Sequence, residues 1–226
     1  MSEILYIAAK APRAGFVKTR LAAAIGEPEA AILYGAFLHD LAARFARAKF
    51  PVGWYVTPAD AWRELEPLVG GPGRVSPVLV QDHGTWTERQ RELFRRAPAR
   101  GEERIVLVSS DSPQLRVETV DAAFRGLETS DIVIGPTHDG GYYLLGMRGW
   151  HDVLDGVAMS TPTVVEEILG RARAGGLSAT TLEATFDVDE HRDLTPLASL
   201  ARSRPDLEAT WAVLESLGEV PLQVAS

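Results

Sequence analysis

The 226-residue sequence contains no cysteine, which excludes disulfide bridges, zinc–thiolate centres and thiol nucleophiles. Long hydrophobic runs are also missing, because apolar segments such as 105–108 and 132–134 fall far short of the roughly 20 residues that span a bilayer. The first residues, 1–3, carry none of the basic side chains that begin a secretory signal peptide. We therefore expect a cytoplasmic protein with no membrane partner.

Positive charge is in short supply, since 23 Lys and Arg residues face 31 Asp and Glu residues and leave a net charge of −8. Such a chain repels nucleic acid and anionic membranes unless its cations gather in one place. A small anionic ligand needs only a local basic pocket. The composition, 46% hydrophobic and 24% charged, is otherwise that of an ordinary globular protein with one domain.

Short apolar segments alternate with longer segments of helical periodicity along the whole chain. Strands are predicted at 3–9, 51–56, 77–81, 104–108, 131–134, 142–147 and 179–182, and helices at 28–49, 60–69, 87–96, 116–127, 161–174, 190–201 and 205–217. This order predicts an α/β fold with three layers, α/β/α, around a mostly parallel sheet. A glycine-rich turn, and no helix, joins the strands at 131–134 and 142–147, so this pair could introduce an antiparallel strand. The loop at 70–73 is too short to separate domains.

A basic loop follows the first predicted strand. Its eleven residues, 10–20, carry the four cations Lys10, Arg13, Lys18 and Arg20, with Gly15 and Thr19 among the small residues between them. Because ligands of such sheets bind beyond the carboxyl ends of the strands, the loop is placed to wrap a polyphosphate. A solvated basic loop is the alternative. The sequence has neither G-x-G-x-x-G nor G-x-x-x-x-G-K-[ST], which argues against a dinucleotide-binding oxidoreductase and a P-loop NTPase.

Carboxylates follow two further strands. Asp111 ends the most apolar strand within Ser-Asp-Ser-Pro, where it could hold Mg²⁺ beside phosphate oxygens or simply cap the next helix. Asp187 and Asp189 point the same way if the chain there is extended, so they could complete a metal site. One of them could instead cap the following helix.

A glycine-rich segment at 135–146 is the remaining candidate. Gly140 and Gly141 let the backbone approach a ligand closely, and Tyr142 or Tyr143 could stack on a ring or bond a hydroxyl group. Asp139 is a candidate base that orients the acceptor. Asp-Gly-Gly is also ordinary hairpin chemistry, so a plain turn is the alternative.

The order of these segments is more informative than any one of them. They read Lys-x-Pro-x-x-Gly-x-x-Lys-Thr-Arg-Leu at 10–21, Ser-Asp-Ser-Pro at 110–113, Gly-Pro-x-x-Asp-Gly-Gly-Tyr-Tyr-Leu-x-Gly at 135–146 and Asp-Val-Asp at 187–189. Together they resemble a bacterial family of GT-A-fold proteins labelled as glycosyltransferases, some of them assigned to arsenosugar biosynthesis. More distantly, the chain is similar to the guanylyltransferases that activate 2-phospho-L-lactate or molybdopterin. The similarity covers residues 3–200, and the long third motif is quite specific.

The resemblance implies a single GT-A-like domain over residues 1–226, with the fold of nucleotide-diphospho-sugar transferases. A nucleotide-binding half would occupy about 1–115 and an acceptor-binding half about 116–226. By position, the cations of the basic loop match a phosphate loop, Asp111 matches a ligand of Mg²⁺ or Mn²⁺, residues 139–143 match a substrate loop, and Asp187 or Asp189 matches a late acidic position.

The chain also departs from these relatives in two stretches. Residues 83–90 read His-Gly-Thr-Trp-Thr-Glu-Arg-Gln where relatives carry a Gly-Asp-Leu-Gly-Glu-Arg-Met-like stretch. Residues 159–161 read Met-Ser-Thr where relatives commonly show Trp-Ser-Thr. Both changes bear on the acceptor more than on the fold.

We therefore expect a metal-dependent transferase with a nucleotide substrate. Glycosyl transfer from a nucleoside diphosphate sugar to a small-molecule acceptor stands first, on the family label. The alternative is transfer of a nucleoside monophosphate from a triphosphate to a phosphorylated small molecule, because four cations on one loop suit a triphosphate better. A nucleotide-binding protein without turnover is the third hypothesis, and the intact set of aspartates argues against it. In both enzymes the metal and the cations would stabilise charge on the leaving phosphate.

Overall fold

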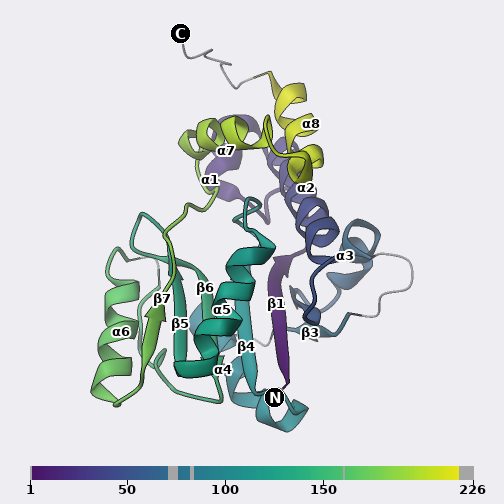
Figure 1. The fold of residues 1–226 in the computed structure, drawn as a ribbon. Helices are drawn as coiled ribbons and strands as arrows, with labels where there is room; N and C mark the ends of the chain where they lie inside the picture. The colour runs from purple at the N-terminus through teal and green to yellow at the C-terminus, as the bar shows by residue number, and fades with distance from the viewer. Residues whose placement is uncertain (1, 71–75, 82–83, 160, 219–226) are drawn as a thin grey trace.

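The computed structural model describes residues 2–70, 76–81, 84–159 and 161–218. Within these residues seven strands form one sheet in the order β3-β2-β1-β4-β6-β5-β7 (Figure 1). The strands are β1 (Glu3–Lys10), β2 (Val52–Thr57), β3 (Val78–Val80), β4 (Arg104–Ser109), β5 (Ile132–Pro136), β6 (Tyr142–Arg148) and β7 (Ala179–Thr181). Strand β6 runs antiparallel to β4 and β5, and the other neighbouring pairs are parallel. The predicted α/β class and mostly parallel sheet are confirmed.

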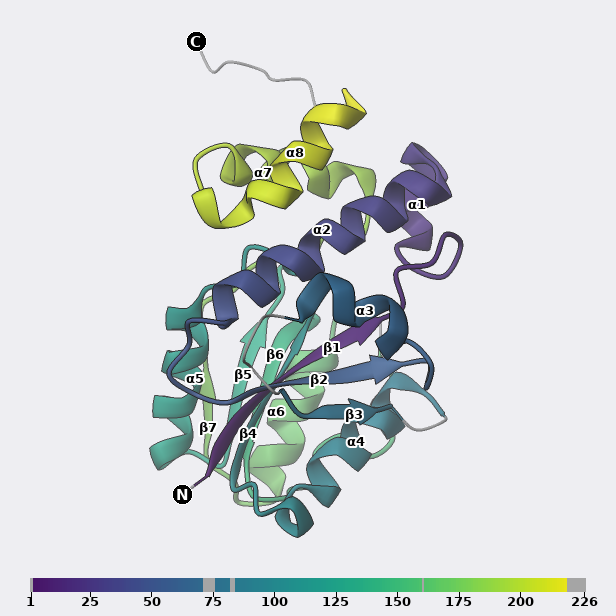
Figure 2. The same cartoon turned by 90° about the vertical axis from the view of Figure 1, so that its right-hand side faces the viewer.

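Helices cover both faces of this sheet. They are α1 (Thr19–Ile25), α2 (Glu27–Phe45), α3 (Trp62–Val69), α4 (Trp86–Arg96), α5 (Val117–Thr129), α6 (Val164–Ala174), α7 (Leu194–Ala201) and α8 (Glu208–Leu217), with short 3₁₀ turns η1 (Pro98–Arg100), η2 (His191–Asp193) and η3 (Pro205–Leu207). Helices α2, α3 and α5 share one apolar core with the sheet, and α4 and α6 share a second core on the opposite face. Helices α7 and α8 lie on the outer side of α2 (Figure 2). No helix in the described ranges is long and apolar enough to cross a membrane.

The central strands are apolar on both sides because both of their faces are covered. In β1, Leu5 and Ile7 belong to the core with α2, whereas Ile4 and Tyr6 belong to the core with α4. Burial on both faces is what produces continuous apolar runs in the strands of such sheets, so the sequence pattern reads directly as central strands. The residues of β4 alternate between the two cores in the same way, and Asp111 follows shortly after its carboxyl end.

Two differences from the sequence-based prediction concern the ends of helices. Helix α1 was not predicted, because its seven residues carry only two buried positions, Leu21 and Ile25, too few for a visible period. The helices predicted to begin at 190 and 205 start instead with the 3₁₀ turns η2 and η3, and the one predicted from 161 begins at Val164. Most of the predicted 70–73 loop lies outside the described residues.

Candidate active site

A cavity of about 490 Å³ opens at the end of the sheet where β1 and β4 finish and β6 begins. Most of the predicted site residues line it: Lys10, Arg20, Asp111, Asp139, Gly141, Tyr142, Tyr143, Asp187 and Asp189. They come from four separate segments of the chain, which the sheet brings to one place. The carboxyl ends of parallel strands are where ligands of open α/β sheets bind, so this cavity is the candidate active site.

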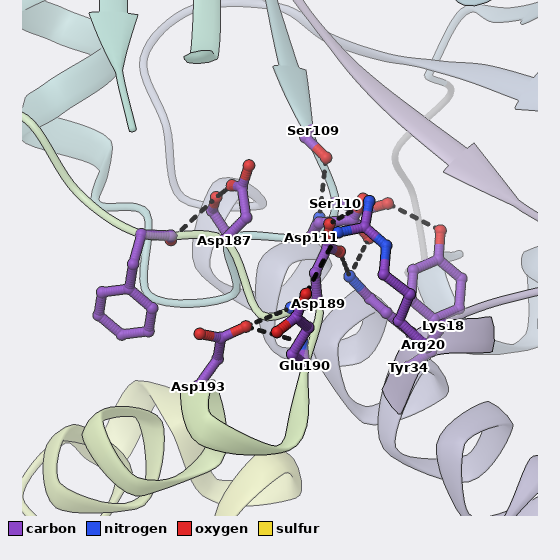
Figure 3. A network of polar contacts seen from close by, with 12 residues as sticks. Lys18, Arg20, Tyr34, Ser109, Ser110, Asp111, Asp187, Asp189, Glu190 and Asp193 are labelled. Carbon is purple, nitrogen blue, oxygen red and sulfur yellow. Dashed lines mark hydrogen bonds and ion pairs between the residues drawn. The ribbon is translucent and has the colours of Figure 1, made fainter. Parts of the chain in front are cut away.

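Lys18 holds the centre of a charged network beside the cavity (Figure 3). Its ammonium lies 2.5 Å from Asp111 and 3.1 Å from Asp189, and its side chain is only 3% exposed. Burial works to lower the pKa of this ammonium, but the charges and hydrogen bonds of the two carboxylates outweigh that effect and raise it. Lys18 in turn lowers the pKa of Asp111, against the opposing effect of burial. Both groups are therefore charged at neutral pH.

The backbone of Lys18 has an unusual conformation. Lys18 precedes α1 and has φ 49° and ψ 42°, a left-handed conformation that is unfavourable for a residue with a Cβ. It is the one residue other than glycine with positive φ in the described part of the chain. Backbone strain of this kind persists where surrounding contacts fix it, often at functional sites.

Asp187 differs from the other carboxylates of the network. Its side chain accepts a hydrogen bond from the Ser112 hydroxyl. Burial raises the pKa of Asp187 to about 7, and the nearby charge of Asp111 adds to this effect, while the Ser112 bond opposes it. In the part of the chain that the structure describes, no three His, Cys, Asp or Glu side chains form a group that could hold a metal ion. Asp111 and Asp187 together offer the one or two carboxylates that Mg²⁺ usually takes beside substrate oxygens.

The remaining residues of the basic loop have different surroundings. Arg20 is 64% exposed and lies 3.7 Å from Asp189 and 3.6 Å from Glu190. Arg13 faces the start of α3, where its guanidinium pairs with Asp60 at 3.1 Å and Glu64 at 2.5 Å. Gly15, Thr19 and Arg13 are not among the described residues that line the cavity. The loop therefore presents Lys10 and Arg20 to a ligand, with Lys18 behind them.

The turn between β5 and β6 forms another wall. The Asp139 carboxylate accepts hydrogen bonds from the Thr137 hydroxyl at 2.5 Å and the Gly141 N–H at 3.2 Å. The Thr137 bond, with the Gly141 bond, lowers the pKa of Asp139 against the opposing effect of burial. A carboxylate held in this way is a weak base, and the role of Asp139 towards an acceptor stays a prediction. Gly140, with φ 91°, packs so tightly that an added Cβ would lie 2.0 Å from the Pro162 carbonyl oxygen.

Both tyrosines of this segment have hydroxyl partners within the protein. The Tyr142 hydroxyl donates to Gln90 Oε1 at 2.8 Å, and the Tyr143 hydroxyl donates to the Glu183 carbonyl at 3.1 Å. Burial raises the pKa of Tyr143 to about 12, so its phenol stays protonated. Contact of either ring with a ligand stays a prediction.

The cavity wall beside β3 and α4 was not predicted from the sequence. Gln81, Trp86, Arg89 and Gln90 line the cavity there. Arg89 donates to Gln81 Oε1 at 2.9 Å and lies 5.9 Å from the Trp86 ring. The only available signal was that stretch 83–90 departs from the relatives. His83 of that stretch, and Ser160 of the other departing stretch, lie outside the described residues.

Comparison with known proteins places the chain in a family. Residues 41–161 match the model of a family described as "Uncharacterized protein conserved in bacteria (DUF2064)". A 3-phospho-D-glycerate guanylyltransferase from Phenylobacterium zucineum (strain HLK1) is 31% identical over 211 residues, which cover 86% of this chain and 92% of that protein. The predicted similarity to guanylyltransferases is confirmed, and so is the prediction of a transferase.

Solved structures confirm the fold. A candidate nucleotide-diphospho-sugar transferase from Desulfovibrio desulfuricans G20 superposes with a TM-score of 0.87 at 30% identity, covering 96% of this chain and 95% of that one. A CMP:2-keto-3-deoxy-manno-octonic acid synthetase, solved with CTP, reaches a TM-score of 0.55 at 14% identity over 90% of this chain and 100% of that one. At that identity the second match shows similarity of fold alone. The predicted nucleotide-diphospho-sugar transferase fold is thus correct.

Proposed function

This chain belongs to the DUF2064 family. We propose that it is a nucleotidyltransferase, which moves a nucleoside monophosphate from a triphosphate to a phosphorylated small molecule. The observation that carries the proposal is the guanylyltransferase relative, whose similarity extends over nearly the full length of both chains. Glycosyl transfer, which the family label put first, stays the second candidate, because the name of the Desulfovibrio structure refers to nucleotide-diphospho-sugar transfer. The alternative from the sequence analysis therefore becomes the leading function.

The reaction we propose is an in-line displacement. A phosphate oxygen of the acceptor forms a bond to the α-phosphorus of the triphosphate, and the bond from that phosphorus to the bridging oxygen breaks, so pyrophosphate leaves with the electron pair. The protein has to align the two substrates and to stabilise negative charge on the leaving group. Lys10 and Arg20 line the cavity and can contact the phosphates directly.

Asp111 and Asp187 would hold Mg²⁺ or Mn²⁺ together with phosphate oxygens. Bound there, the ion would supply positive charge to the reacting phosphates. Lys18 keeps Asp111 ionised, which is the state that a metal ligand needs. Asp189, which shares Lys18 with Asp111 and also pairs with Arg20, would position these cations beside the ion.

The two ends of the cavity offer different chemistry to the two substrates. The β3 end carries the Trp86 ring and the Arg89 guanidinium, which suit a flat heteroaromatic base. The β5 end carries Asp139 and Thr137, which suit the hydroxyl groups of an acceptor. We therefore propose that residues up to about 115 bind the nucleotide and later residues bind the acceptor.

A product assay separates the candidate functions. We expect GTP, incubated with 3-phospho-D-glycerate and Mg²⁺ or Mn²⁺, to yield one pyrophosphate per conjugate formed. The other triphosphates are compared in parallel. Calorimetry should show the triphosphate binding more than about tenfold tighter than the diphosphate, or ~1.4 kcal/mol, because the diphosphate leaves cationic contacts unused. Asp111→Asn should lose turnover and keep its circular dichroism spectrum.

Other outcomes would point to the other functions. Transfer of sugar from a nucleoside diphosphate sugar, with no pyrophosphate release from any triphosphate, would restore glycosyl transfer. Tight nucleotide binding without turnover on a panel of phosphorylated acids would favour the inactive binding protein.

A further inference from the structure

The hydrogen-bond ladder between β1 and β4 ends at the cavity. The last rung is the Ser110 N–H, which donates to the Ala8 carbonyl at 3.2 Å. Beyond it, the Lys10 N–H donates to the Tyr34 hydroxyl at 3.0 Å. Tyr34 comes from α2, so a side chain of the covering helix takes up the backbone donor at the point where the two strands separate.

The same hydroxyl reaches the strand on the other side of the gap. The Tyr34 oxygen lies 2.7 Å from Ser110 Oγ (Figure 3). Both residues line the cavity although they are nearly buried, with Tyr34 2% and Ser110 3% exposed. The hydroxyl pair therefore sits between Lys10, at the end of β1, and Asp111, the next residue after Ser110.

Hydrogen counting leaves one hydroxyl hydrogen of the pair for a ligand, because the two hydroxyls share a single hydrogen bond. The Tyr34 oxygen already accepts the Lys10 N–H, and its single hydrogen can be donated to Ser110 Oγ. If Ser110 donated instead, the Tyr34 hydrogen would be the one left for a ligand, and one nearly buried hydroxyl needs an outside acceptor in either case. The order Lys10 N–H to Tyr34 O–H to Ser110 Oγ leaves the Ser110 hydrogen free. Consecutive bonds of this kind polarise one another, so the last hydroxyl becomes a stronger donor.

We propose that the Ser110 hydroxyl donates a hydrogen bond to a phosphate oxygen of the bound nucleotide, and that Tyr34 is the positioning residue that orients it. The cavity supplies the reason for this ligand, since Lys10 and Arg20 line it beside Ser110 and attract an anionic oxygen. The identity of the ligand rests on the proposed function, whereas the hydroxyl pair and its bond from the Lys10 N–H rest on geometry alone. Ser110 would thereby add an uncharged hydrogen-bond donor to the phosphate contacts of Lys10 and Arg20.

Calorimetry with Tyr34→Phe, Ser110→Ala and the double variant tests the relay. The probes are ATP, CTP, GTP and UTP with Mg²⁺, and the matching nucleoside without phosphate in competition. We expect each single variant to weaken triphosphate binding about tenfold, as for loss of a hydrogen bond to a charged partner. The double variant should lose little more than either single one, because the two hydroxyls act as one unit. Binding of the nucleoside should change less than twofold.

Tyr6→Phe is the matched control, because it removes another buried hydroxyl, one bonded to Glu102 and outside the described cavity lining. It should keep wild-type affinity.

If the wild-type protein binds a triphosphate but Tyr34→Phe and Ser110→Ala both bind it within about twofold as well, the relay is wrong and the proposed function stands. Equal losses for triphosphate and nucleoside would mean that the hydroxyls only maintain the fold. Multiplied losses in the double variant would refute the positioning role of Tyr34. Absence of binding by the wild-type protein to all four triphosphates would overturn the proposed function itself.

Discussion

Lys18 and Arg20 lie two positions apart and occupy opposite environments. The Lys18 side chain is 3% exposed between two carboxylates, whereas that of Arg20 is 64% exposed at the mouth of the cavity. A buried cation supports the fold and the ligand together, while an exposed one contributes to the ligand alone. The two positions therefore separate structural from binding effects within one loop.

We predict that Lys18→Ala lowers both thermal stability and nucleotide affinity, and that Arg20→Ala lowers affinity only. The stability loss for Lys18→Ala should be about 1–2 kcal/mol, less than the ~3–5 kcal/mol of a fully buried pair because its carboxylates are partly solvated. Each variant should lose roughly tenfold to a hundredfold in nucleotide binding. Thermal melting and calorimetry measure the two effects. An equal fall in melting temperature for both variants would contradict the distinction.

At the residue scale, the sequence indicated which side chains follow strands, and therefore which ones gather at one edge of the sheet. It could not indicate which of four similar cations lines the cavity. The contacts that decide this come from distant residues: Arg13 is held by Glu64, 51 positions away, and Lys18 by Asp189, 171 positions away. The phosphate-binding role of Arg13 stays a prediction, and its ion pairs give no support for it. Trp86 and Arg89 were missed because an isolated aromatic and a helix arginine carry no distinctive pattern.

The turn between β5 and β6 and the start of α6 depend on each other. Gly140 N–H donates to Thr137 O at 3.2 Å, and the Val165 N–H donates to Gly140 O at 3.3 Å. A Cβ on residue 140 would meet the Pro162 backbone, and its φ of 91° is unfavourable for any residue with a side chain. The position holds the Asp139 wall of the cavity against the helix.

We predict that Gly140→Ala displaces this wall and lowers acceptor-dependent turnover at least tenfold, while triphosphate binding changes less than threefold. Steady-state kinetics and calorimetry give the two values. Gly149→Ala is the matched control, because Gly149 also has positive φ, 75°, and an added Cβ there meets no atom within 4 Å. Equal kinetic losses in the two variants would show that backbone strain alone, without the contact to Pro162, accounts for the effect.

Element existence was more predictable than element ends. Strands β1 and β4 were predictable because they are buried on both faces. The glycine-rich turn indicated a departure from parallel order. The antiparallel direction of β6 was expected from this turn. Its place between β4 and β5 could not be predicted, because hairpin chemistry does not say which further neighbour the second strand joins. Helix α1 escaped notice since it is short and lies between two segments that read as loop and helix.

The C-terminal helices are tied to the rest of the molecule through α2. Arg44, in α2, donates to the backbone carbonyls of Pro113 and Leu115 and pairs with Asp206 in η3. Asp40 accepts hydrogen bonds from the N–H groups of Ala209 and Thr210 at the start of α8. The same cluster thus joins α8, α2 and the turn that follows Asp111.

We predict that Asp206→Asn removes part of the pH dependence of stability. Hydrogen bonds from Arg204 and Arg44 hold the pKa of Asp206 below its ordinary value of 3.8. A carboxylate whose folded pKa is lowered stabilises the fold above its unfolded pKa and loses that contribution as the pH falls. The wild-type melting temperature should therefore drop more steeply between about pH 5 and about pH 3 than that of the variant, which should already be lower at neutral pH. Parallel curves would contradict the assignment.

Strand β6 makes the two halves of the chain inseparable. It covers the outer edge of β4 and pairs with β5 on its other side, yet it follows both of them in the sequence. A fragment that stopped at residue 115 would expose a row of unpaired backbone donors and acceptors along β4, which is a template for aggregation. In a nascent chain, likewise, this edge of β4 stays unpaired until residue 148 has emerged from the ribosome. Recombination between relatives could therefore exchange one half only where the register of β4 against β6 is kept, which ties the evolution of the two halves to each other.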